Sequence, residues 1–119
     1  MPKVTHQIPT ASRFNYAVLK YATKRGVEFH RSEVMEAMAD HFNLSAEARR
    51  QLTEGKNDFC YKIRTTRALS TFVRYGGLLR RTRRGYYKIT DVGRKELRRT
   101  SGETITLHYI QNNYRHISE

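Results

Sequence analysis

The chain has 119 residues, of which 38% are hydrophobic, and this suits one domain with one modest core. Its formal net charge of +12 and its pI near 10.3 are typical of a protein whose partner is a polyanion. The single cysteine excludes an internal disulfide, and no apolar run approaches the roughly 18 residues that a membrane-spanning helix needs. We therefore expect a cytoplasmic protein that has no membrane partner.

The positive charge is concentrated in one stretch of the sequence. Residues 1–58 carry nine Lys or Arg and seven Asp or Glu, whereas residues 59–100 carry thirteen and two. Residues 101–119 carry one Arg and two Glu. Charge that served only solubility would be spread more evenly, so this distribution favours a dedicated basic surface.

The first part of the chain is predicted to be helical. Residues 1–8 are expected to form a flexible leader before a domain that spans residues 9–100. Apolar residues recur at helical spacing over residues 11–25, which predicts a first helix with Thr10 as its N-cap. Gly26 follows two basic residues and predicts the end of this helix.

A short strand and two further helices are expected next. Residues 27–30 are too few for a helix and predict an edge strand. A second helix is predicted over residues 31–42. Its buried side is expected to carry Val34, Met35, Met38 and Phe42. Ser45 is a good N-cap for a third helix, which is expected to end at Gly55.

A long basic helix is predicted over residues 59–75, with Asp58 as its cap and Gly76-Gly77 as its stop. Its buried side is expected to hold Phe59, Ile63, Leu69, Phe72 and Val73, with Thr66 between them. The opposite stripe is expected to hold Arg64, Arg67, Thr71 and Arg74. A purely structural helix would more often mix both signs of charge, so this acid-free face predicts an anionic partner.

A basic β-hairpin is predicted after this helix. Residues 78–81 and 86–89 have the pattern of two strands, and Gly85 in the turn can adopt a positive φ. Tyr87 and Ile89 are expected to point inward. A helix over residues 91–99 should follow, with Thr90 as its cap and core contacts from Val92 and Leu97.

Residues 101–119 are expected to form a C-terminal extension. A short closing helix is predicted around residues 106–114, although the apolar spacing fits neither helical nor strand periodicity cleanly. The extension could pack against the first helix of its own domain, or it could form the interface of a homodimer. The sequence does not favour one over the other.

The order of these elements predicts a mostly helical α+β fold, a winged helix-turn-helix with a two-stranded β-hairpin as its wing. A helix of about 10–12 Å diameter fits the major groove of B-DNA, which is about 12 Å wide. The hairpin can then reach neighbouring phosphates or the minor groove. We therefore expect double-stranded DNA as the partner.

The expected DNA contacts lie on the basic helix and on the hairpin. On the helix they are Tyr61, Lys62, Arg64, Thr65, Arg67, Thr71 and Arg74. On the hairpin they are Arg80, Arg81, Arg83, Arg84, Tyr86 and Lys88. Arginine can bind guanine bidentately and hydroxyl groups suit phosphate, although half or more of protein–DNA hydrogen bonds go to the DNA backbone. The helix cations could instead only screen phosphates, the hairpin charges could protect an edge strand, and Tyr86 could pack on the hairpin.

Signals for catalysis or metal binding are weak. The histidines and Cys60 lack metal-ligand spacing, and no glycine-rich phosphate loop is present. Asp40, Glu54 and Lys56 can be fitted to the Asp…Glu-x-Lys pattern of some nucleases, but residues 54–56 have no predicted strand to carry them. No catalytic residue, metal, cofactor or small-molecule substrate is therefore expected.

Several segments resemble the N-terminal domain of Mrr-type restriction endonucleases. They are Ile8-Pro9-Thr10, the run VMEAMADHFNLS over residues 34–45, Gly77-Leu78-Leu79, Arg84-Gly85-Tyr86-Tyr87-Lys88-Ile89-Thr90 and Gly93-Arg94. The resemblance covers residues 8–100 and implies a winged-helix DNA-recognition domain. In that family the domain usually precedes a nuclease domain, and since this sequence ends at Glu119, restriction activity is not expected. Position 68 is alanine where the family would have an aromatic residue, so the basic helix is expected to pack differently.

Two classes of function are open. The first is a double-stranded DNA-binding protein in the nucleoid: a transcriptional regulator, a nucleoid-type binder or a DNA-recognition module related to restriction systems. The alternative is an adaptor that binds protein or RNA through the same basic face. A standalone nuclease is a third and weaker reading of the sequence.

Overall fold

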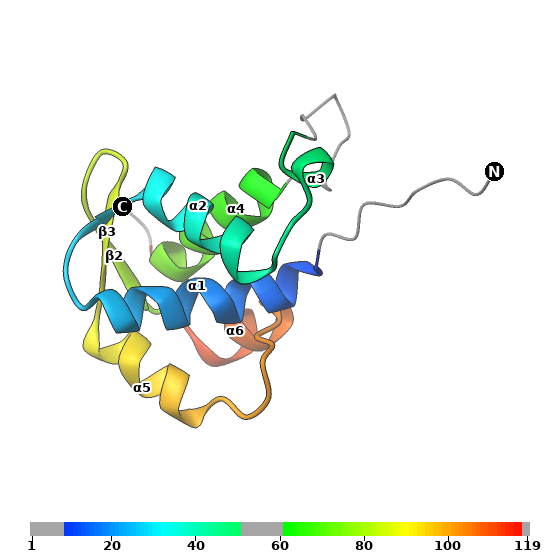
Figure 1. Cartoon of the computed structure of the whole chain (residues 1–119). Helices are drawn as coiled ribbons and strands as arrows, with labels where there is room; N and C mark the ends of the chain where they lie inside the picture. Colours follow the sequence, from blue (N-terminus) through cyan, green and yellow to red (C-terminus); the bar gives the residue numbers. More distant parts are fainter. Residues whose placement is uncertain (1–8, 51–60, 118–119) are drawn as a thin grey trace.

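A computed structural model describes residues 9–50 and 61–117, in which helices surround one side of a small antiparallel sheet (Figure 1). The predicted mostly helical α+β class is confirmed. The expected leader, the end of the third helix, the Asp58 cap and Cys60 lie outside the described residues. Among the helices of the described part, none is long and apolar enough to cross a membrane.

Helix α1 (Ala11–Arg25) has its predicted bounds and runs through the middle of the fold. Its buried residues are Phe14, Asn15, Ala17, Val18, Leu19 and Ala22. Thr10 occupies the N-cap position, but its side chain makes no capping hydrogen bond. Gly26 ends the helix with a φ of 68°, a left-handed conformation that glycine adopts without steric cost.

The next elements follow in the predicted order: β1 (Phe29–His30), α2 (Arg31–His41) and α3 (Ala46–Arg50). Val34 and Met38 are buried on α2, whereas Met35 and Phe42 are half-buried and pack against the core. The Ser45 side chain caps α3 by accepting a backbone N–H at 3.1 Å. Of these elements, α2 packs against α1.

Helix α4 (Tyr61–Arg74) packs against α1 and α2 and leads into strands β2 (Leu79–Arg83) and β3 (Tyr86–Ile89). The three strands are ordered β1-β3-β2, and both pairings are antiparallel. The expected hairpin and edge strand are thus confirmed, with β3 in the centre of the sheet. Ala68 is fully buried where α4 meets the core.

Helix α5 (Asp91–Arg99) has its predicted bounds, and the Thr90 hydroxyl oxygen caps it by accepting the Gly93 N–H at 3.1 Å. The expected core contact of Val92 is wrong, because this side chain is 40% exposed. Gly93 and Glu96 are buried instead, and Leu97 is half-buried against the core. At Gly93 the helix approaches Leu78 and Ile89 so closely that a Cβ would clash with both.

Helix α6 (Leu107–Asn113) confirms the closing helix expected around residues 106–114. Ile105 and Ile110 are buried in the common core. Asn15 Nδ2 donates to the Ile105 carbonyl at 2.8 Å, and the Ile105 N–H donates to the Ser12 carbonyl at 3.0 Å. The extension therefore packs against α1 of its own domain, while a homodimer stays a prediction.

Replacing Gly93 with alanine is expected to destabilise the fold by about 1–3 kcal/mol, because overpacking a close contact forces the backbone to move. A Cβ at this position would lie 2.2 Å from the Leu78 carbonyl oxygen and 2.6 Å from Ile89 Cδ1. Urea unfolding followed by circular dichroism measures the change. Val92→Ala, one position earlier and exposed, is the control; equal unfolding free energies for both variants would contradict the close packing.

Candidate nucleic-acid interface

The outward face of α4 is rotated relative to the stripe predicted from the sequence. Ile63 and Val73, expected in the core, are only half-buried. The buried side consists of Tyr61, Thr65, Ala68, Leu69 and Phe72. The accessible stripe consists of Lys62, Arg67, Ser70 and Arg74, and the half-buried Thr66 lies within it. Because α4 packs against α1, α2 and β2, more than one neighbour determines which of its side chains reach solvent.

Two predicted DNA contacts lie in the core. Tyr61 is 4% exposed and Thr65 is 0% exposed, so neither side chain is accessible to DNA. The Thr65 hydroxyl donates to the Tyr61 carbonyl at 2.8 Å, which satisfies it within the helix. The expected contact roles of these two residues are therefore wrong. Their polar groups suggested exposure, but their positions on the helix face α1 and α2.

Two further predicted contacts lie at the margin of the accessible stripe. Arg64 is half-buried, and its guanidinium donates to the Pro9 carbonyl just before α1. Thr71 is half-buried one turn after Arg67. Of the predicted helix contacts, Lys62, Arg67 and Arg74 are exposed, so these three have the geometry that contact with a ligand requires.

The pairing of β2 with β3 separates the basic residues of the hairpin. Arg81 pairs with Tyr87 on the face that also carries Leu79 and Ile89, which are buried. An irregularity between Arg81 and Arg83 shifts the register, so that Arg83 pairs with Tyr86. Paired residues share a face of the sheet. Arg80 and Lys88 pair with each other on the outer face of the hairpin.

Glu28 neutralises part of the outer face of the hairpin. Its carboxylate accepts a hydrogen bond from the Thr82 hydroxyl and one from Arg83 Nη2 at 3.2 Å. These two donors hold the pKa of Glu28 below its ordinary value. The Arg83 guanidinium also lies 3.9 Å above the Tyr86 ring, whose other neighbour is the His30 ring. Tyr86 thus packs on the hairpin, and Arg83 already has an anionic partner.

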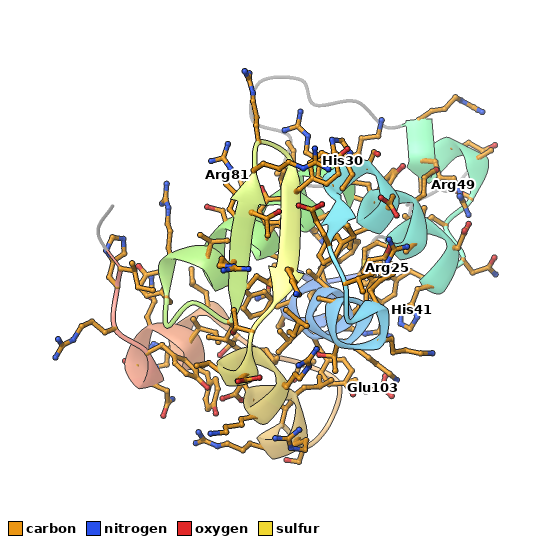
Figure 2. All side chains as sticks on the ribbon, turned by 90° about the vertical axis from the view of Figure 1, so that its left-hand side faces the viewer. Arg25, His30, His41, Arg49, Arg81 and Glu103 are labelled. Carbon is orange, nitrogen blue, oxygen red and sulfur yellow. The ribbon has the colours of Figure 1, made fainter. Side chains whose placement is uncertain are left out.

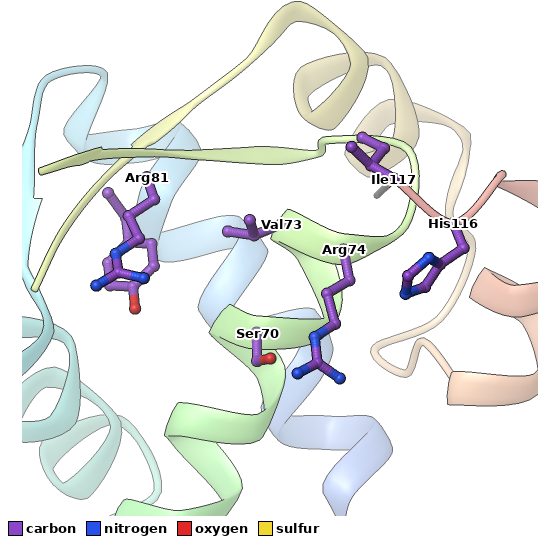
Figure 3. A pocket seen from close by; sticks show the side chains of 7 residues that line it. Ser70, Val73, Arg74, Arg81, His116 and Ile117 are labelled. Atoms are coloured by element: carbon purple, nitrogen blue, oxygen red, sulfur yellow. The ribbon is translucent and has the colours of Figure 1, made fainter. Parts of the chain in front are cut away.

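An open groove of about 630 Å³ lies between α4, β2 and the C-terminal segment (Figure 3). Its lining residues are Ser70, Val73, Arg74, Arg81, Tyr87, His116 and Ile117. Figure 3 shows Arg74 between Arg81 on one side and His116 on the other. Within residues 9–50 and 61–117, neither arginine forms an ion pair. The groove therefore offers two guanidinium groups, from separate elements, to an anion.

Arg84 is exposed in the hairpin turn, and the last four basic residues of the stretch 59–100 lie on α5, away from this groove. In Figure 2, α5 is at the opposite end of the molecule from the hairpin turn, and Arg81 lies beside the upper part of the hairpin. Arg94 Nη1 is 3.7 Å from an Asp91 carboxylate oxygen, and Arg99 Nη1 is 4.0 Å from one of Glu96. The concentration of charge along the sequence therefore corresponds to more than one surface in space.

Sequence reasoning missed three polar residues of this interface. Thr66 and Ser70 extend the stripe of Arg67 and Arg74 at helical spacing, so a correctly rotated helix would have included them. No local signal indicated His116, because its place in the groove depends on a pairing between distant parts of the chain. Among the described residues, no group of three His, Cys, Asp or Glu side chains could hold a metal ion.

A family model for the Mrr N-terminal domain matches residues 12–99. The chain belongs to this family. Comparisons with curated proteins and with solved structures give no match. The match extends from α1 to the end of α5, and it includes every residue predicted to contact DNA. Helix α6 and the groove residues His116 and Ile117 lie beyond the matched residues.

A buried carboxylate holds this C-terminal segment against the Mrr N-terminal domain. Glu96 is 0% exposed, and its oxygens accept the Tyr109 hydroxyl at 2.9 and 3.1 Å. The hydroxyls of Tyr114 and Thr100 donate to the same carboxylate. Burial, reinforced by the bond to Glu96, raises the pKa of Tyr109 and that of Tyr114. Glu96 is thereby fully satisfied by donors from α6 and from the residues that end α5 and α6.

Tyr114→Phe is expected to lower the free energy of unfolding by about 1–3 kcal/mol, since it removes one donor from a buried carboxylate. The folded state raises the pKa of Tyr114, so its stabilisation is present below the ordinary tyrosine pKa of about 10 and is lost as pH rises further. Urea unfolding at neutral and at alkaline pH measures both effects. Tyr16→Phe is the control, because the described residues offer its hydroxyl no hydrogen-bond partner.

Proposed function

We propose that this domain binds double-stranded DNA through the accessible stripe of α4 and the groove between α4 and β2. The observation that carries the proposal is that Arg74 and Arg81, from separate elements, line one open groove, whose lining side chains within residues 9–50 and 61–117 include no acidic residue. Two guanidinium groups on one groove, neither of them in an ion pair with a described residue, favour a polyanion. The element order agrees with a winged helix, in which α4 is the recognition helix and β2–β3 is the wing.

The dimensions support major-groove binding by α4. An α-helix is about 10–12 Å across with its side chains, and the major groove of B-DNA is about 12 Å wide. Lys62 and Thr66 would lie toward the N-terminal end of α4, where recognition helices often meet base edges, and Arg67 follows one residue later. We expect Arg67 to carry any sequence preference, and Arg81 and Arg84 to contact phosphates.

Membership of the Mrr N-terminal domain family favours one biological role over the others. The domain is proposed as a DNA-recognition module related to restriction systems, with no catalytic step of its own. Regulation of transcription and nucleoid-type binding would use the same interface. A homodimer would present two such faces to one duplex.

Arg81→Ala is expected to lower affinity for duplex DNA by about tenfold, since a hydrogen bond to a charged group contributes about 1.5 kcal/mol or more. The slope of log affinity against log salt should also fall by about 0.9 for each phosphate that the variant no longer neutralises. Fluorescence anisotropy with random duplexes over a salt series measures both quantities. The control is Arg98→Ala, which removes the same charge from α5.

Equal decreases in affinity for the Arg81→Ala and Arg98→Ala variants would show that only net charge matters and would contradict the groove assignment. Competition between duplex DNA and a structured RNA tests the choice of nucleic acid. Preference for the RNA would overturn the proposal in favour of an RNA-binding adaptor.

Glu28→Gln is expected to raise DNA affinity by about two- to fivefold at low salt, because it removes a carboxylate from the hairpin and releases Arg83. The increase should shrink as salt screens the interaction. Glu103→Gln is the matched control, since Glu103 is exposed and Figure 2 places it far from the hairpin turn. A decrease in affinity for Glu28→Gln would indicate that Glu28 orients Arg83 for binding rather than competing with DNA.

A further inference from the structure

The C-terminal segment forms one wall of the groove that α4 and β2 share. His116 and Ile117 line it together with Arg74 and Arg81. We propose that His116 is an additional DNA-contacting residue, and that its ligand is the sugar–phosphate backbone of the strand beside α4. This inference rests on the proposed DNA binding, and it extends the interface beyond residues 12–99, where the family match ends.

Backbone pairing fixes this wall to the end of α4. The Gly76 N–H donates to the Arg115 carbonyl at 2.9 Å, and the Ile117 N–H donates to the Arg74 carbonyl at 2.6 Å. Between these bonds, Tyr75 and His116 face each other in an antiparallel bridge. The Tyr75 and His116 rings also meet edge to face, with centroids 5.2 Å apart. His116 is therefore held in a defined place beside Arg74.

Close packing next to this pairing requires a glycine at position 76. Gly76 has a φ of 71°, and a Cβ there would lie 2.4 Å from Tyr114 Cδ1. The Tyr114 hydroxyl meanwhile donates to the buried Glu96 carboxylate. The segment is thus anchored on both sides of Arg115, by Tyr114 before it and by the bridge after it. Such a double anchor keeps the exposed His116 ring at the rim of the groove.

The chemistry of the wall fits a phosphate better than a base edge. An imidazole N–H donates a hydrogen bond to a phosphate oxygen, and protonation adds a positive charge. His116 lies beyond the C-terminal end of α4, whereas bases are usually read from the N-terminal part of a recognition helix. Ile117, 43% exposed, and the half-buried Val73 offer apolar surface that a deoxyribose could cover. Among the described residues that line the groove, no carboxylate opposes an anion there.

The test compares His116 variants of the full chain by anisotropy with several duplex sequences. His116→Ala should lower affinity by about three- to tenfold on all sequences alike, as removal of a phosphate-binding group does. His116→Lys should restore affinity to the wild-type level or above it, because a cation replaces the donor. His108→Ala is the matched control: it removes an exposed histidine of α6 that does not line the groove.

Each outcome decides the inference. Equal decreases in affinity for His116→Ala and His116→Lys, with unchanged melting temperatures, would overturn it, since the residue would then matter only through its shape. Unchanged affinity in His116→Ala, while Arg81→Ala binds weakly, would overturn it and leave the proposed function intact. Failure of the wild-type chain to bind any duplex would overturn both proposals.

Discussion

The seating of α4 against α1 and α2 is the constraint on which the rest of the interface depends. Five side chains of α4, including Leu69 and Phe72, are buried, and the helix packs against α1, α2 and β2. Burying a large apolar side chain contributes about 1.5–3 kcal/mol, so rotating α4 to expose a different stripe would cost several such contacts. The core therefore selects which polar residues reach solvent, and the stripe of Arg67, Ser70 and Arg74 is a consequence of hydrophobic packing.

The register of the β2–β3 pairing determines on which face of the hairpin each basic side chain lies. The irregularity after Arg81 leaves this residue on the side of the sheet that faces α4, and it turns Arg83 toward Glu28. An exposed ion pair of this kind contributes little to stability, typically about 0–1 kcal/mol. Its larger effect is electrostatic, because it removes Arg83 from the set of uncompensated charges. The register thus places Arg81 on the α4 side, whereas Arg80 and Lys88 lie on the outer face with the Arg83–Glu28 pair.

Local sequence signals predicted the elements well, and long-range contacts explain the errors. The bounds of α1 and α5 were predictable because caps, stops and apolar spacing act within one or two turns. Thr65 and Val92 were misplaced because their burial depends on which neighbours a helix meets and how closely it approaches them. The concentration of charge in residues 59–100 identified the basic hairpin, but no count along the chain separates β2 from α5 in space. His116 was unpredictable, since only the folded chain brings it beside Arg74.

Glu96 links the stability of the domain to the shape of its groove. A buried carboxylate is costly unless donors satisfy it, and three hydroxyls, one from α6 and one from the residue that ends each of α5 and α6, do so here. The C-terminal segment supplies two of these donors, Tyr109 and Tyr114. If the segment did not fold against α5, Glu96 would lose both of these hydrogen-bond partners, and without Glu96 the two tyrosine hydroxyls would lose their acceptor. The same segment continues into the pairing with Tyr75 that forms one wall of the groove. Glu96 lies outside the groove and is fully buried, so DNA cannot contact it. Through the C-terminal segment, it nevertheless determines whether the groove has its third wall.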